Sequence, residues 1–144
     1  MRSRDTFQSA VFFWQPDLVR GERVNVGIAV TSPQSKFSRA RFLGLEELRP
    51  LGKLFYSSEQ EIEWLSTILV DYAEVVQEAR ELGRDFSLRY DHPHIFTALF
   101  GRSQEGSAIQ WRSASSGLIL TSPQETLDEL FERYIARGQR RTSE

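Results

Sequence analysis

The sequence predicts an α+β fold, in which a mainly antiparallel sheet carries two main amphipathic helices packed on one face. Three observations lead to this prediction. Strand-like segments are grouped at residues 7–43, a long helical pattern follows at 59–82, and short strands precede a last helix. Strands that are grouped, rather than alternating with helices, are typical of α+β architecture.

Two apolar segments near the N-terminus are predicted to be antiparallel neighbours. Residues 7–14 include the run VFFW, which places bulk on both faces and is typical of a covered central strand. Residues 24–31 alternate between two faces, Val24, Val26, Ile28 and Val30 against Asn25, Gly27 and Ala29. The small side chains of Gly27 and Ala29 predict that a backbone or a helix approaches their face.

The middle of the chain predicts a third strand and the longest helix. Residues 36–43 alternate arginines with apolar residues after a Ser-Pro turn, as in a strand with one wet face. Residues 45–49 predict one helical turn before an apolar connector. Ser58, with Glu61 three residues later, is a capping box for a helix whose apolar stripe continues until Gly83.

The last part of the chain predicts short strands and a final helix. Residues 86–90, 108–113 and 117–121 are strand candidates, 112–117 (RSASSG) is a hairpin loop, and a helix starts near Ile95. Ser122 and Pro123 open the last helix. No repeat or linker interrupts the pattern. We therefore expect a single domain over 1–144, with frayed tails at 1–6 and 138–144.

Composition limits the classes of function. The 144 residues are 40% hydrophobic and 26% charged with a net charge of -2, so the chain is globular without overall basic character for nucleic acid or anionic lipid. The lack of cysteine excludes disulfides and thiolate metal sites. No segment approaches the roughly 20 apolar residues of a membrane helix. We expect a cytoplasmic protein that does not contact membranes and, without a phosphate-binding glycine pattern, needs no cofactor.

The connection between the first two strands, residues 15–22, is the main candidate for a functional site. Its proline, glycine and charged residues also suit a structured turn with solvated charges. Alternatively, Asp17, Arg20 and Glu22 join the strand residue Asn25 in binding an anionic or amide-bearing ligand, or a protein partner. Arginine suits such a site because it makes bidentate contacts to carboxylates and phosphates. The sequence leaves both interpretations open.

Metal chemistry has two weaker candidates. Pro16-Asp17 is similar to the start of a metal-dependent nuclease motif, but the strand after it lacks the required lysine and second carboxylate. His92 and His94 follow an aspartate, but no other histidine exists to complete a ligand set. A turn whose histidines cap the next helix is the preferred interpretation, and we expect no metal.

Two further surfaces are candidates for binding. Trp64 and Tyr72 broaden the apolar stripe of the long helix, which indicates core packing or, alternatively, an interface with a partner or a second copy. The arginines at 133, 137, 140 and 141 are candidates for contact with nucleic acid. Arginines near a helix C-terminus also complement its dipole without any ligand, which is the preferred interpretation.

The string FWQPDLVRGERVNVGIAV resembles the opening of an uncharacterised bacterial family, domain of unknown function 3037 (DUF3037). The matching positions are Phe13, Pro16, Asp17, Arg20, Gly21, Glu22, Asn25, Val26 and Gly27. The ending GLILTSPQETLDELFERYI is similar in kind, whereas the Trp14-Gln15 pair departs from the pattern. The resemblance implies a shared fold and, because members are sometimes encoded beside kinase-like partners, an accessory role. It also singles out Arg20, Gly21, Glu22 and Asn25.

Three functions follow as expectations. The first is a small bacterial interaction module, more plausibly not an enzyme, that binds a protein partner or itself through residues 15–22 with Asn25 or through the helix surface around Trp64. The second is an enzyme or small-ligand binder with an Arg20/Glu22/Asn25 site. The third is nucleic-acid binding, which requires a basic face that the composition does not indicate.

Overall fold

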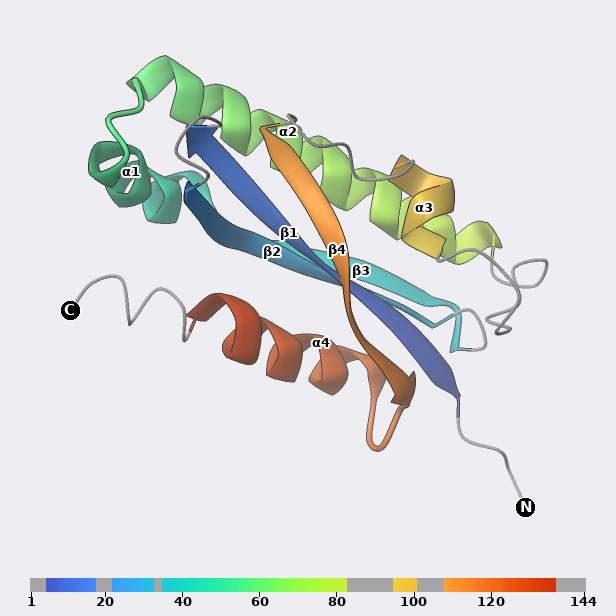
Figure 1. Ribbon diagram of the computed structural model, residues 1–144. Helices are drawn as coiled ribbons and strands as arrows, with labels where there is room; N and C mark the ends of the chain where they lie inside the picture. The colour runs from blue at the N-terminus through green and yellow to red at the C-terminus, as the bar shows by residue number, and fades with distance from the viewer. Residues whose placement is uncertain (1–4, 18–21, 33–34, 83–94, 101–107, 137–144) are drawn as a thin grey trace.

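The computed structural model describes residues 5–17, 22–32, 35–82, 95–100 and 108–136. It has a four-stranded antiparallel sheet in the order β3-β2-β1-β4, with helices on both faces (Figure 1). The strands are β1 (Thr6–Asp17), β2 (Glu22–Ser32), β3 (Phe37–Phe42) and β4 (Ile109–Leu118). The helices are α1 (Leu45–Leu54), α2 (Glu59–Glu78), α3 (Ile95–Phe100) and α4 (Pro123–Phe131). A 3₁₀ turn (Ala79–Leu82) follows α2, and a π-helical segment (Glu132–Ala136) continues α4. The predicted α+β class is confirmed.

Strand β1 is the centre of the sheet. It pairs with β2 on one side and β4 on the other, and Val11 and Phe12, which point to opposite faces, are both buried. The prediction of a central strand covered on both faces is confirmed. Phe12 is fully buried, and its ring lies within an aromatic cluster made by Phe42, Tyr72, Phe96 and Phe100.

Helix α2 covers one face of the sheet. The Ser38 hydroxyl donates a hydrogen bond to the carbonyl of Val76 in α2 and also contacts the Thr31 hydroxyl. Tyr72 of α2 packs on Phe12 from the same side, and burial raises the pKa of its phenol. This face is the drier side of β3, as its alternating pattern predicted.

Helix α4 covers the opposite face, so the expectation that both main helices share one face is wrong in this respect. Arg39 and Arg41 alternate with Ser38 along β3, and both contact α4 rather than α2. Figure 1 shows α2 and α4 on opposite sides of the sheet. The physical reason is that Ile28 and Val30 of β2 form a second apolar face, which α4 buries with Leu127, Leu130 and Phe131.

A bulge in β2 changes which residues share a face. Phe12 pairs with Gly27, but the next residue, Phe13, pairs with Asn25, so Val26 is the extra residue. The predicted strict alternation is therefore wrong before Gly27: Asn25 faces α4, together with Ile28, instead of sharing the face of Gly27. The space above Gly27 is filled by the Phe42 ring of β3, rather than by a backbone or a helix.

The RSASSG segment is strand, and the predicted hairpin loop at 112–117 is wrong. Residues 109–118 form one continuous strand because β1 offers a partner along its whole length. The buried Ser9 hydroxyl accepts a hydrogen bond from the Ser115 amide at 2.9 Å and donates to the Ser115 carbonyl. Ser9 lies at a second strand irregularity, between Gln8 and Ala10, where the register of β1 with β4 shifts, and its two hydrogen bonds join the strands there.

The predicted helix starts are confirmed. Ser58 and Ser122 accept hydrogen bonds from the amides of Glu61 and Glu125, and Pro123 is the first residue of α4. Helix α3 starts at Ile95 as expected. Helix α1 is longer than the predicted single turn: it continues through Pro50 to Leu54. Within the described part of the chain, none of the helices has the length and apolar character needed to cross a membrane.

Candidate functional site

The strand connection that the sequence singled out is shorter than predicted. Asp17 and Glu22 form the last backbone pair of β1 and β2, so only residues 18–21 lie between the two strands. Arg20 and Gly21 lie outside the described residues. The backbone thus brings Asp17 and Glu22 opposite each other, while a site that includes Arg20 stays a hypothesis.

Asn25 connects the sheet to the end of the last helix. Its side-chain Nδ2 donates a hydrogen bond of 3.0 Å to the Tyr134 carbonyl, in the π-helical segment after α4. The last carbonyls of a helix have no partner within the helix, and a side-chain donor satisfies one of them. The bulge at Val26 turns Asn25 toward α4. Asn25, one of the predicted site residues, therefore makes a structural contact, and this contact explains the asparagine of the NVG string.

Asn25→Ala should lower the free energy of unfolding by about 1 kcal/mol, because it removes one hydrogen bond that is partly shielded from water. Urea unfolding followed by circular dichroism measures the loss. Thr67→Ala is the matched control, since its hydroxyl bonds a carbonyl on the exposed side of α2. An Asn25→Ala protein as stable as the wild type would contradict the capping role.

The metal candidates His92 and His94 lie outside the described residues. In the ranges that the structure describes, three or more potential ligands of the His, Asp and Glu type do not come together at any point. Of the arginines considered for nucleic-acid contact, Arg133 is exposed near the end of the last helix, and those at 137, 140 and 141 lie outside the described residues.

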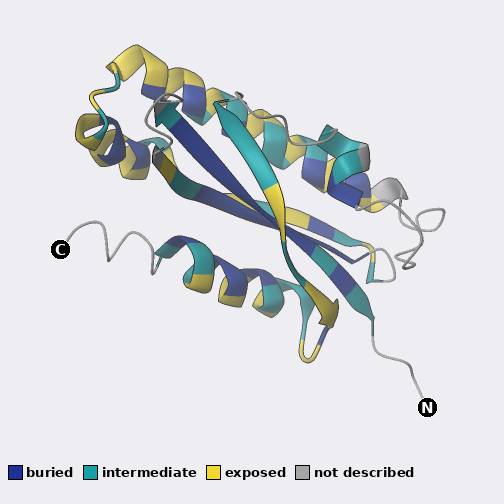
Figure 2. Ribbon diagram, in the orientation of Figure 1, coloured by how far each residue is buried: buried dark blue, intermediate teal, exposed yellow. Residues whose placement is uncertain are grey.

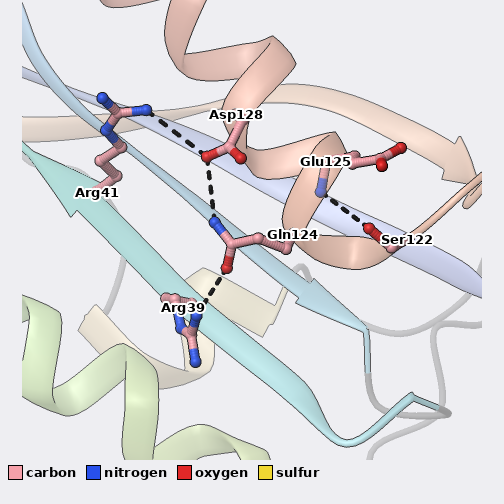
Figure 3. A network of polar contacts seen from close by, with 6 residues as sticks. All are labelled: Arg39, Arg41, Ser122, Gln124, Glu125 and Asp128. Atoms are coloured by element: carbon pink, nitrogen blue, oxygen red, sulfur yellow. Dashed lines mark hydrogen bonds and ion pairs between the residues drawn. The ribbon is translucent and has the colours of Figure 1, made fainter.

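A polar network joins α4 to β3 (Figure 3). Arg39 Nη1 donates to Gln124 Oε1 at 2.7 Å, and Gln124 Nε2 donates to Asp128 Oδ1 at 3.1 Å. Asp128 Oδ1 lies 3.6 Å from Arg41 Nη1, and the Arg41 guanidinium carbon is 3.8 Å from the centre of the Phe131 ring. Ion pairs this exposed contribute about 0–1 kcal/mol each. The network orients α4 on the sheet, and its polar groups already bind one another.

Large hydrophobic residues of α1, α2 and the turn between them are exposed. Leu54, Tyr56 and Trp64 are 51%, 91% and 53% exposed, and we refer to these three residues as the α1–α2 surface. Trp64 lies five residues into α2, about 7.5 Å along its axis. The preferred interpretation of Trp64 as a core residue is wrong, whereas Tyr72 is packed in the Phe12 cluster. Figure 2 shows that the exposed residues of α2 follow the side away from the sheet.

Tyr56 is held in an unusual conformation. It has φ +58° at the end of α1, where its amide bonds the Lys53 carbonyl and the Ser57 amide bonds the Gly52 carbonyl. These two bonds form a Schellman motif, whose left-handed position is usually glycine. The preceding residue, Phe55, packs edge-on against Trp14 of β1. Phe55 thus anchors the turn while Tyr56 projects into solvent. No glycine marks the helix end, so this feature could not be predicted from the sequence.

Comparison with known proteins assigns a family but no activity. The model of a family described as "Protein of unknown function (DUF3037)" matches residues 10–135, which is most of the chain. Neither a curated protein nor a solved structure gives a significant match. The match confirms the resemblance and extends it across the middle of the chain, including α1 and α2.

Proposed function

The chain belongs to the DUF3037 family, and we propose that it is a protein-interaction module whose α1–α2 surface binds a partner protein. The observation that carries the proposal is Tyr56, a large aromatic residue that is 91% exposed and has positive φ. A left-handed conformation costs a non-glycine residue about 1–2 kcal/mol. Burial does not compensate this cost, and strained residues cluster at binding sites.

Two other exposed residues of α1 and α2 support the proposal. Trp64 is half-exposed on the outer side of α2, and Leu54 is half-exposed at the end of α1. The ion pair from Arg49 Nε to Glu59 Oε1, at 2.9 Å, and the close packing of Gly52 on Ile62 hold the two helices together. Tryptophan and tyrosine supply a large share of the energy at protein interfaces. A rigid helical pair that presents both residues needs little reorganisation to bind.

The other expected functions have less support. A ligand site made by Arg20, Glu22 and Asn25 has less support because the Asn25 side chain already donates a hydrogen bond to the Tyr134 carbonyl. Nucleic-acid binding is disfavoured by the acidic composition of α2. A cytoplasmic location in a bacterium belongs to the same proposal, and the cysteine-free sequence supports it.

Trp64→Ala should reduce recovery of a specific partner by about tenfold or more without lowering the melting temperature. Tyr56→Gly should weaken the same interaction while raising stability by about 1 kcal/mol, because glycine adopts positive φ without strain. The measurement is quantitative mass spectrometry of proteins that co-purify with each variant from the source cells, together with thermal melts.

Leu120→Ala is the matched control, since Leu120 is 73% exposed and lies outside the α1–α2 surface. A partner lost in Trp64→Ala and Tyr56→Gly but retained in Leu120→Ala supports the proposal. Partners recovered equally with all three variants would refute it.

A further inference from the structure

The outer side of α2 carries unbalanced negative charge. The helix has six acidic residues and neither lysine nor arginine: Glu59, Glu61, Glu63, Asp71, Glu74 and Glu78. Glu59 is paired with Arg49. The exposed residues Glu63, Asp71, Glu74 and Glu78, which we call the acidic face, lie opposite the buried stripe, on the same outer side as Trp64. Within the described ranges, these four side chains form no ion pair.

This arrangement is unfavourable for the isolated helix. Glu74 and Glu78 are four residues apart, a spacing at which like charges repel. Both lie near the C-terminal end of α2, where the helix dipole disfavours anions, and the last turn has no basic residue. They also line a surface hollow of about 380 Å³ together with Gln77 and Arg80. A cationic side chain from another molecule would relieve both penalties.

We infer that the partner bound at the α1–α2 surface is a different protein with a lysine- and arginine-rich surface that lies along the acidic face. This inference rests on the proposed function and names the chemistry of the partner. The apolar contact is made by Trp64, whose indole also accepts a cation on its ring face. The carboxylates accelerate association and exclude acidic partners, as charge complementarity does at other interfaces.

Three described arginines of a second copy are already engaged within their own chain. Arg39 and Arg41 bind Gln124 and Asp128 of α4, and the Arg23 guanidinium carbon lies 5.2 Å from the centre of the Phe13 ring. A contact between α2 of one copy and the opposite face of another would also be heterologous, and such contacts propagate into filaments unless they close into a ring. A nucleic acid or an anionic membrane is repelled by the acidic face.

The test places a photo-crosslinking amino acid, benzoyl-phenylalanine, at Thr67 in the full chain, which is expressed in the source cells and irradiated in their lysate at a set salt concentration. Thr67 is exposed and lies between Trp64 and Asp71. The same probe at Glu129, exposed on α4, is the control position. Mass spectrometry of the adduct identifies the crosslinked peptide. We expect a lysine- or arginine-rich peptide from another protein at position 67 but not at 129, with a yield that falls about tenfold between 50 and 300 mM salt.

Charge variants supply the second readout. Glu74→Gln/Glu78→Gln should reduce the adduct about fivefold or more, yet raise the melting temperature by about 2–4 °C, because repulsion is relieved. Glu125→Gln/Glu129→Gln removes the same charge at the same spacing from α4 and should leave the adduct unchanged. A merely structural role for the two carboxylates would not couple higher stability to weaker crosslinking.

The outcomes separate the two proposals. An adduct at 67 with a neutral or acidic peptide, or one insensitive to salt and to Glu74→Gln/Glu78→Gln, overturns the inference and leaves the proposed function standing. An adduct with a second copy of the chain also overturns it. Failure to obtain an adduct at 67, or equal adducts at 67 and 129, overturns the proposed function and the inference together.

Discussion

Phe12→Ala should lower the free energy of unfolding by about 3–5 kcal/mol, the usual cost of removing a fully buried phenylalanine. Phe12 is 1% exposed. Its ring centroid lies 5.1 Å from that of Phe42 and 5.4 Å from that of Phe100, with Tyr72 at 5.9 Å and Phe96 at 6.4 Å. No single neighbour can fill the cavity, because the four rings belong to β3, α2 and α3. Urea denaturation followed by circular dichroism measures the loss.

A domain of ordinary stability, about 5–15 kcal/mol, loses a large part of it through this one change. Leu118→Ala, at a half-exposed residue of the edge strand β4, should change stability by no more than about 0.5 kcal/mol. A loss below about 1 kcal/mol for Phe12→Ala would mean that the aromatic cluster does not hold α2 and α3 on the sheet.

Gly27→Ala should lower the free energy of unfolding by about 1–3 kcal/mol, the usual cost of overpacking a core. An added Cβ would lie 1.9 Å from Cδ1 and 2.5 Å from Cε1 of the Phe42 ring. That ring cannot move aside freely, because its edge-to-face contact with Phe12 fixes it within the core. The glycine of the NVG string is therefore explained by the close approach of an aromatic ring.

A double-mutant cycle with Phe42→Ala tests this explanation. Phe42→Ala is destabilising by itself, but it removes the atoms with which the new Cβ collides. Gly27→Ala should therefore cost little in that background, giving a coupling of about 1 kcal/mol or more between the two positions. Additive effects would show that Gly27 is required for another reason.

Local pattern was sufficient to predict most elements of this fold. Ser58 and Ser122 mark helix starts because an N-cap is decided by a few adjacent residues. The β1 and β2 strands follow from the apolar runs that they contain. The RSASSG segment of β4 could not be recognised, because small polar residues look like a loop until β1 provides the partner.

Features that depend on contacts between elements could not be predicted from the sequence. The bulge at Val26 depends on the register between β1 and β2, and it decides that Asn25 faces α4. The placement of α4 on the face opposite α2 depends on the apolar surface made by Ile28 and Val30 together with α4's own stripe. An alternating strand pattern alone does not indicate that both faces are covered.

The candidate site was only partly predictable. Trp64 stood out as an aromatic residue on the flank of a broad stripe, but the sequence could not show where the buried part of that stripe ends. Tyr56 was missed because its positive φ arises from the Schellman bonds that end α1. The acidic face was not recognised from the sequence, because its position opposite the buried stripe became clear only when α2 was placed on the sheet.

The most direct test of the account is the affinity of the crosslinked partner for Trp64→Ala and Asn25→Ala, measured by isothermal titration. The proposed binding surface lies on α1 and α2, whereas Asn25 has a structural role. We therefore expect that Trp64→Ala weakens binding by about tenfold or more, whereas Asn25→Ala, although less stable, stays within about twofold of the wild type. Loss of binding in Asn25→Ala with wild-type affinity in Trp64→Ala would contradict it and return the function to the β1–β2 end of the sheet.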